Sequence, residues 1–218
     1  MTRIKACCMA SIAEMQMAVA AGVDAVGLVA RMPSGPGPIA DDLIADIAAT
    51  VPPPITAFLL TSETRADAIV DHVRRTGAPV VQIVSHIDPA EAARLAQLLP
   101  HTRRVQVIHI EGDAALAMIA DYAPHVHAFL LDSGRPGAAT PTLGGTGDVH
   151  DWAISARFVA ASPRPVFLAG GLNAANVAAA IAQVRPFGVD VCSGIRSVGA
   201  LDIAKLNAFV AAVRQAGL

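Results

Sequence analysis

Short apolar runs alternate with longer amphipathic segments along the whole chain. The apolar runs are dense in Val and Ile with little polar alternation, which is typical of parallel strands buried on both faces. These runs predict strands at Ile4–Cys8, Ala25–Val29, Ile55–Leu60, Val80–Val84, Val105–Ile110, Ala128–Leu131, Val166–Ala169 and Val189–Cys192. The segments between and after them predict helices at Ser11–Ala21, Asp41–Thr50, Thr64–Thr76, Pro89–Leu98, Asp113–Tyr122, Trp152–Ala161, Ala174–Val184 and Asp202–Gln215.

Residues that commonly begin or end helices stand at the borders of these segments. Ser11, Asp88 and Asn173 are placed to cap helix N-termini, because their side-chain oxygens can accept hydrogen bonds from free backbone N–H groups. Gly22 and Gly77 follow helices at positions where the chain commonly turns through a left-handed conformation.

The alternation predicts the class of fold. An open doubly wound sheet and a closed barrel are both compatible with repeated strand–helix units. Eight such units fill the 218 residues and leave no linker, which favours a single (β/α)8 TIM barrel domain over residues 1–218. The longest segment rich in Gly, Pro and Thr, 133–147, follows the sixth strand, where barrel enzymes often carry moving lids.

Composition excludes several classes of function. Hydrophobic residues make up 54% of the chain and charged residues 16%, with a formal net charge of −2 and no basic run, so neither nucleic acid nor a membrane surface is an expected partner. No apolar stretch approaches the roughly 20 residues of a membrane span. We also expect no signal peptide, and the odd cysteine count of 3 favours reduced thiols in the cytoplasm over a disulfide framework.

In a barrel of this class, functional side chains lie at or just beyond the carboxyl ends of the strands. This rule selects few reactive or permissive residues. They are Cys7, Cys8, Arg31, His86, His109, Glu111, Asp132, Gly170–Gly171 and Ser193–Gly194.

Two glycine-containing turns follow the last two expected strands. Gly170–Gly171 and Ser193–Gly194 stand where barrels commonly bind phosphate on backbone N–H groups, and glycine permits the close approach that a side chain would block. A single glycine-containing turn of this kind is equally expected of an ordinary tight turn that binds no ligand. Two turns at consecutive strand ends predict a phosphate site.

Asp132 and Cys7 are candidates for proton transfer. A carboxyl group at the end of an apolar strand is either an acid–base group or a solvated strand-end residue. A free Cys on a buried strand is either a small apolar side chain or, at the barrel mouth, a thiolate base. Pairing of the first and eighth strands would bring Cys7, Cys8 and Cys192 near one another. We expect no metal site there, because metal-ligand spacings are absent and neighbouring strand residues point to opposite faces.

These residues lie within motifs that resemble the phosphoribosylanthranilate isomerase family of tryptophan biosynthesis. The resemblance runs from Lys5 to the last helix and is strongest from Leu130 onward. It is carried by Lys5-Ala6-Cys7, by Ala21–Gly27, by Leu130–Ser133 with Gly144–Gly147 and Asp151-Trp152, by Leu168–Asn173 with Asn176-Val177, and by Arg185–Val191.

The resemblance implies an Amadori rearrangement of a phosphorylated aminoaldose to an aminoketose, with Asp132 as the acid and Cys7 as the base. It implies no cofactor and no metal, because the substrate nitrogen serves as the electron sink. The residues that would bind the substrate and its phosphate are Gly145, Thr146, Gly170, Gly171, Ser193 and Gly194.

The chain departs from the family pattern at three places. At the fourth strand, the family's Val-Gln-Leu-His-Gly is replaced by Val81-Gln82-Ile83-Val84-Ser85-His86. The family has an arginine in the loop after the second strand, whereas Ser34–Ile39 contains none, which leaves Arg31 as the nearest candidate cation. Cys8 replaces the glycine that follows the base. Two alternatives therefore stand beside the isomerase: a paralogue acting on a different phosphorylated amino-sugar, and a non-catalytic barrel that binds a phosphate ligand. The expected partner is a phosphorylated small molecule, and the protein is expected to be a monomer or a homodimer.

Overall fold

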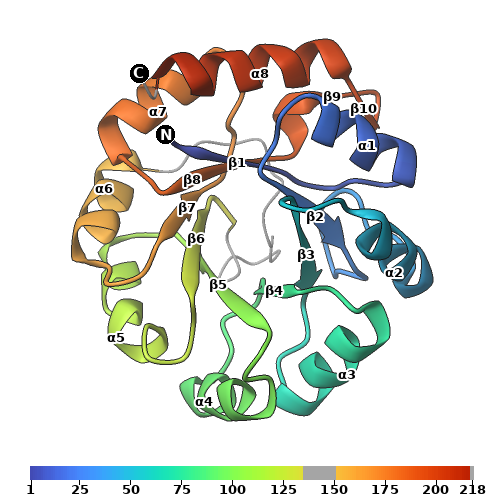
Figure 1. Ribbon diagram of the computed structural model, residues 1–218. Helices are drawn as coiled ribbons and strands as arrows, with labels where there is room; N and C mark the ends of the chain where they lie inside the picture. Colours follow the sequence, from blue (N-terminus) through green and yellow to red (C-terminus); the bar gives the residue numbers. More distant parts are fainter. Residues whose placement is uncertain (135–150, 217–218) are drawn as a thin grey trace.

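The strands close into a ring that the helices surround (Figure 1). The structure is a computed structural model and describes residues 1–134 and 151–216. Within these residues, parallel strands pair in chain order and β8 pairs with β1, which closes the barrel. The strands are β1 (Arg3–Ala6), β2 (Ala25–Val29), β3 (Thr56–Thr61), β4 (Val80–Ile83), β5 (Arg103–His109), β6 (Ala128–Asp132), β7 (Val166–Leu168) and β8 (Gly188–Val191). The expected TIM barrel is confirmed.

The helices pack against the outside of this ring (Figure 1). They are α1 (Ile12–Ala20), α2 (Asp41–Thr50), α3 (Ala66–Thr76), α4 (Pro89–Leu98), α5 (Met118–Tyr122), α6 (Trp152–Ala161), α7 (Val177–Val184) and α8 (Ile203–Ala216). Ser11 and Asp88 cap α1 and α4 as expected, and Gly77 ends α3 with a left-handed φ of 65°. Among the described helices, none has both the length and the apolar character needed to cross a membrane.

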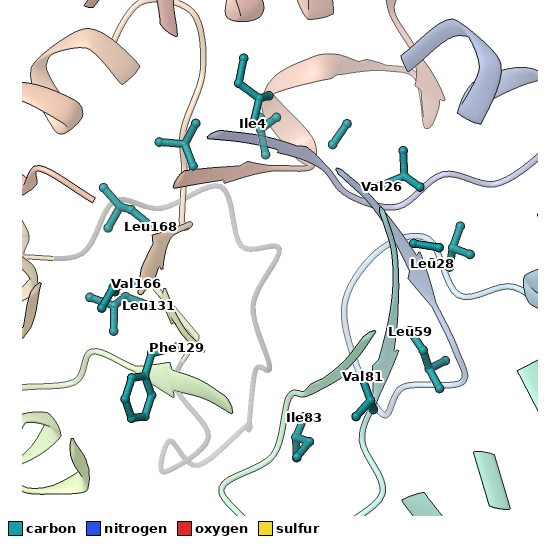
Figure 2. Packing of buried hydrophobic residues seen from close by; sticks show 14 of the residues in the cluster. Ile4, Val26, Leu28, Leu59, Val81, Ile83, Phe129, Leu131, Val166 and Leu168 are labelled. Atoms are coloured by element: carbon teal, nitrogen blue, oxygen red, sulfur yellow. The ribbon is translucent and has the colours of Figure 1, made fainter. Parts of the chain in front are cut away.

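Side chains leave each strand alternately toward the helices and toward the barrel axis. Figure 2 shows part of the outward set, including Leu59, Phe129 and Leu168, on the outer side of the barrel wall. The inward set forms a second apolar cluster that includes Phe58 and Phe167. The centre of the barrel is therefore a packed core, and the open space lies at the strand ends.

Three details differ from the expected elements. The segment 113–122 is not one helix: a 3-10 turn (Asp113–Leu116) precedes the short α5. Asn173 does not cap α7, because its side chain accepts from Ala175 N in a preceding turn and the helix starts only at Val177. A short hairpin of β9 (Arg196–Ser197) and β10 (Ala200–Leu201), which the sequence analysis missed, follows β8.

Candidate active site

A pocket opens at the carboxyl ends of the strands. Its wall includes Cys7 from the end of β1, Asp132 from β6 and Asp190 from β8. The turns after β7 and β8 contribute Gly170, Gly171 and Ser193, and the loop after β2 contributes Met32 and Ser34–Pro36. The structure thus brings together the candidate acid, the candidate base and the two glycine-containing turns.

A buried ion pair lies directly below this pocket. The Lys5 ammonium group is fully buried inside the barrel, and its Nζ donates to Asp190 Oδ1 at 2.9 Å. Burial is the largest influence and would lower the pKa of Lys5, but Asp190 and Cys7 together outweigh it and the pKa is raised. Lys5 is therefore a permanent cation beneath the pocket, paired with Asp190 of its wall.

The environment of Cys7 keeps its thiol protonated. Burial raises the pKa of Cys7 to about 11, and the nearby Lys5 ammonium opposes this rise while Asp190 adds to it. Gly27 makes room for this arrangement, because a Cβ built on it would lie 2.7 Å from the Cys7 sulfur and 3.0 Å from Lys5 Nζ. Removing the Cys7 proton thus requires further positive charge near the sulfur.

Asp132 likewise holds its proton more tightly than an exposed carboxyl group does. Burial raises the pKa of its carboxyl group to about 6, although the Ser133 N–H, which donates to Oδ1 at 2.7 Å, favours the charged form. At pH 7 about a tenth of such a group is protonated, compared with about a thousandth of an ordinary Asp. Its side chain is partly open to the pocket, so that proton can reach a bound molecule.

The two glycine-containing turns lie against each other. A Cβ built on Gly194 would collide with the Leu172 carbonyl oxygen and would lie 3.1 Å from Asn173 Cα. Gly170 and Gly171 have left-handed φ angles of 83° and 63°, which other residues rarely adopt. Asn176 donates to the Gly171 carbonyl at 2.9 Å and holds this turn in place. Gly194 thus permits the close contact between the two turns, and Gly170 and Gly171 permit the left-handed backbone of the first turn.

Other predicted site residues lie elsewhere. Gly145 and Thr146, and most of the expected lid at 133–147, fall outside the described residues. The Arg31 side chain is exposed and does not contribute to the described pocket wall.

The two histidines that the strand-end rule selected lie together beside the pocket. The His86 and His109 rings lie 5.2 Å apart, and the His109 backbone N–H donates to His86 Nε2 at 3.3 Å. Burial is the main cause that lowers the pKa of His86, to about 4. Neither ring contributes to the described pocket wall, and both are uncharged at neutral pH.

The expectation of reduced cysteines is wrong for two of the three. Cys8 and Cys192 form a disulfide with a Cα–Cα distance of 5.9 Å, and Cys7 is the free thiol. Strand alternation would keep the Cys8 side chain turned away from those of Cys7 and Cys192. However, β1 ends at Ala6, and Cys8 has a left-handed φ of 65°, so alternation no longer applies to it.

Sequence reasoning also missed two polar residues of the pocket wall and the lysine beneath them. Lys5, Gln82 and Asp190 each stand between apolar neighbours in strands that are buried on both faces. Gln82 Oε1 is buried and has no hydrogen-bond partner among the described residues. A buried charge in such a strand needs an opposite charge nearby, and this requirement was the signal that could have identified the Lys5–Asp190 pair.

The chain is similar to proteins of one family over nearly its whole length. The family model described as N-(5′-phosphoribosyl)anthranilate (PRA) isomerase matches residues 4–212. The N-(5′-phosphoribosyl)anthranilate isomerase of Halobacterium salinarum is 38% identical over 213 residues, which cover 97% of this chain and 95% of that protein. The corresponding enzyme of Haloferax volcanii is also 38% identical, over 218 residues that cover 99% and 95% of the two chains.

Solved structures agree with this similarity. Phosphoribosyl anthranilate isomerase from Thermotoga maritima superposes with a TM-score of 0.84 at 25% identity and full coverage of both chains. TrpF from Jonesia denitrificans gives a TM-score of 0.80 at 29% identity, with 100% of this chain and 98% of that chain covered. A phosphoribosyl anthranilate isomerase in complex with reduced 1-(o-carboxyphenylamino)-1-deoxyribulose 5-phosphate shares the fold, with a TM-score of 0.81 at 23% identity and full coverage of both chains.

Proposed function

The chain belongs to the N-(5′-phosphoribosyl)anthranilate isomerase family, and on this basis we propose that Cys7 and Asp132 catalyse its reaction as base and acid. The enzyme converts N-(5′-phosphoribosyl)anthranilate into 1-(o-carboxyphenylamino)-1-deoxyribulose 5-phosphate, an Amadori rearrangement in tryptophan biosynthesis. One observation carries the assignment of roles: the Asp132 carboxyl group and the Cys7 thiol belong to the wall of the same pocket.

The first step needs an acid. Asp132 donates its proton to the ribose ring oxygen, the bond from that oxygen to C1′ breaks, and the substrate nitrogen forms a protonated imine with C1′. A carboxyl group with a pKa near 6 can hold the proton near neutral pH and still release it to an oxygen that is gaining negative charge. The raised pKa of Asp132 therefore suits this role.

The second step needs a base, and the first step helps to produce it. The positive charge of the imine adds to the field of Lys5 and lowers the pKa of the Cys7 thiol, which burial raises, and the thiol releases its proton to water. The Cys7 thiolate then removes the C2′ proton, and the electron pair of the C–H bond flows toward the nitrogen to give an enolamine. The enolamine gains a proton at C1′, and the C2′ hydroxyl group loses its proton and becomes the ketone.

The substrate phosphate would lie against the turns that contain Gly171, Ser193 and Gly194. This placement is supported by the contact between the two turns and by backbone that approaches the pocket without side chains. Binding energy gained at the phosphate holds the reacting carbons in place without contributing to the bonds that change. We further assign the enzyme to the cytoplasm, as a monomer or homodimer.

The anthranilate end of the substrate calls for a direct test, because the described pocket wall at Met32 and Ser34–Pro36 contains no arginine. The experiment measures kcat/KM of the purified chain for N-(5′-phosphoribosyl)anthranilate and for the matched aniline compound, which lacks only the carboxylate. We expect turnover of the anthranilate compound and lower efficiency on the aniline compound. Equal efficiency on both would favour the paralogue with another substrate, and turnover of neither would overturn the proposed function.

A further inference from the structure

The disulfide between Cys8 and Cys192 joins two parts of the active-site pocket. Cys8 follows Cys7 directly in the chain, and Cys192 directly precedes Ser193 of the proposed phosphate-binding turn. Both cysteines contribute to the pocket wall. The bond therefore couples the segment that carries the proposed base to the segment that would bind the phosphate.

The barrel does not depend on this bond for its closure. The β1–β8 ladder pairs Arg3–Ala6 with Gly188–Val191, and Cys7 N continues it by donating to Val191 O at 2.8 Å. Arg196 adds a second connection, because its Nη1 donates to Cys8 O at 2.8 Å and its Nη2 pairs with Glu14 at 3.0 Å. With the bond open, these contacts would still hold the two strand ends together.

The bond instead fixes local features around the pocket. The left-handed backbone of Cys8 is a conformation that favours glycine, so a cysteine here is maintained at a conformational cost. Its sulfur lies 3.8 Å from the Pro36 carbonyl oxygen, and a Cβ built on Gly37 would lie 2.7 Å from Cys8 Cβ. The Cys8 side chain thus contacts the loop after β2 while it is bonded to the turn after β8.

The disulfide can be reached by small molecules. Cys192 is only half-buried, in contrast to Cys7 and Cys8. It also borders a second hollow of about 400 Å³, on the side of the pocket that faces Pro36–Ile39 and Arg196. In the cytoplasm, which we propose as the location of this enzyme, disulfides are usually transient and redox-sensitive rather than structural.

We propose that Cys8 and Cys192 form a site of reversible thiol–disulfide exchange that controls how tightly the pocket binds its phosphorylated substrate. The co-reactants are low-molecular-weight disulfides and thiols. In oxidation, the Cys192 thiolate attacks a small disulfide, forms a mixed disulfide and releases one thiol. The Cys8 thiolate then attacks the Cys192 sulfur and releases the second thiol. Two electrons and two protons pass to the small molecule, and a dithiol reverses both steps.

The direction of control follows from the position of the bond. When the bond is closed, the turn at Ser193 is held in one arrangement before the substrate arrives, which lowers the ordering cost of binding. When the bond is open, that cost returns and KM rises, while kcat changes little because Cys7 and Asp132 are not part of the bond. Binding and exchange are then reciprocally linked, so a bound phosphate should slow reduction of the disulfide.

The experiment compares the full chain oxidised with glutathione disulfide and reduced with dithiothreitol, each checked by mass and by counting free thiols. This inference rests on the proposed function for its kinetic readout, which is KM and kcat on N-(5′-phosphoribosyl)anthranilate. We expect KM to rise by about 3- to 10-fold on reduction, the scale of ordering one or two side chains. Cys192→Ser should have the higher KM and should no longer respond to dithiothreitol.

A second measurement does not depend on turnover. The rate at which dithiothreitol reduces the disulfide is followed with and without saturating inorganic phosphate, and we expect phosphate to slow it. Equal KM in the two forms together with equal reduction rates would overturn the exchange site, and so would failure of glutathione disulfide to form the bond. If neither form turns over substrate but phosphate still slows reduction, the proposed function fails and the exchange site stands.

Discussion

Replacing Asp132 with Asn should lower activity and raise stability at the same time. Asn has nearly the same shape, and its Oδ1 can still accept the hydrogen bond from the Ser133 N–H. It can neither donate a carboxyl proton nor become charged. Loss of a positioned acid should lower kcat by about 100-fold or more.

The gain in stability follows from the pKa of Asp132. Burial raises this pKa from 3.8 to about 6, so the folded state holds the proton more tightly than the unfolded state. Well below the unfolded value the carboxyl group is neutral in both states and costs nothing. As the pH rises through 6 the folded protein must bury a charge, and a shift of about 2 units corresponds to about 2–3 kcal/mol of lost stability. The Asp132→Asn variant would not incur this loss.

The assay combines kinetics with unfolding by guanidinium chloride at pH 7.5 and at pH 4. We expect Asp132→Asn to be more stable than the wild type by about 2–3 kcal/mol at pH 7.5 and by less than about 1 kcal/mol at pH 4. Asp88→Asn makes the same chemical change at the exposed N-cap of α4, and both readouts should stay unchanged. Wild-type turnover in Asp132→Asn, or an equal stability change at both pH values, would refute this reasoning.

Three further predictions, with their control variants, test the surroundings of Cys7 and Asp132. Lys5→Met leaves the buried Asp190 carboxylate unpaired and should lower the free energy of unfolding by about 3–5 kcal/mol, measured with denaturant. Adding Asp190→Asn to the same chain should restore most of that stability. Gly194→Ala adds a Cβ against the Leu172 carbonyl oxygen and should raise KM, whereas Gly112→Ala, where a Cβ meets nothing within 4 Å, should not. Arg31 is exposed and lies outside the described pocket wall, so Arg31→Ala tests whether its side chain reaches the substrate carboxylate. That contact predicts a roughly tenfold loss of kcat/KM for the anthranilate substrate, the scale of one charge-assisted hydrogen bond, and unchanged efficiency would remove Arg31 from the site.

The barrel was predictable because the same local signal recurs in every unit. A run of Val and Ile too apolar to face water on either side, such as the one around Val81, has to be a strand covered by helices. Element ends were harder to predict, because they depend on tertiary contacts. The turn that begins at Gly170 engages the Asn173 side chain before α7 starts, and in the alanine-rich segment 113–122 packing decides between 3-10 and α-helical hydrogen bonding.

The candidate site was predictable only in part, because several of its features also depend on tertiary contacts. Strand-end position selected Cys7 and Asp132 from the sequence, and the structure brings both to one pocket. The Cys8–Cys192 bond joins residues 184 positions apart and depends on a backbone conformation at Cys8 that residue type does not reveal. The sequence identifies Lys5 only as part of a motif. Its partner Asp190 lies 185 positions away, across the β1–β8 contact that closes the barrel, so the ion pair is visible only in the folded structure.

The central claim is that Cys7 and Asp132 act as base and acid on N-(5′-phosphoribosyl)anthranilate. The most direct test is steady-state turnover of this substrate by the wild type and by Cys7→Ala, which removes only the sulfur. The account predicts a wild-type kcat/KM of about 10⁴–10⁸ M⁻¹s⁻¹ and a kcat at least about 100-fold lower in Cys7→Ala, with the thermal midpoint little changed. Turnover by Cys7→Ala at the wild-type rate would contradict the account.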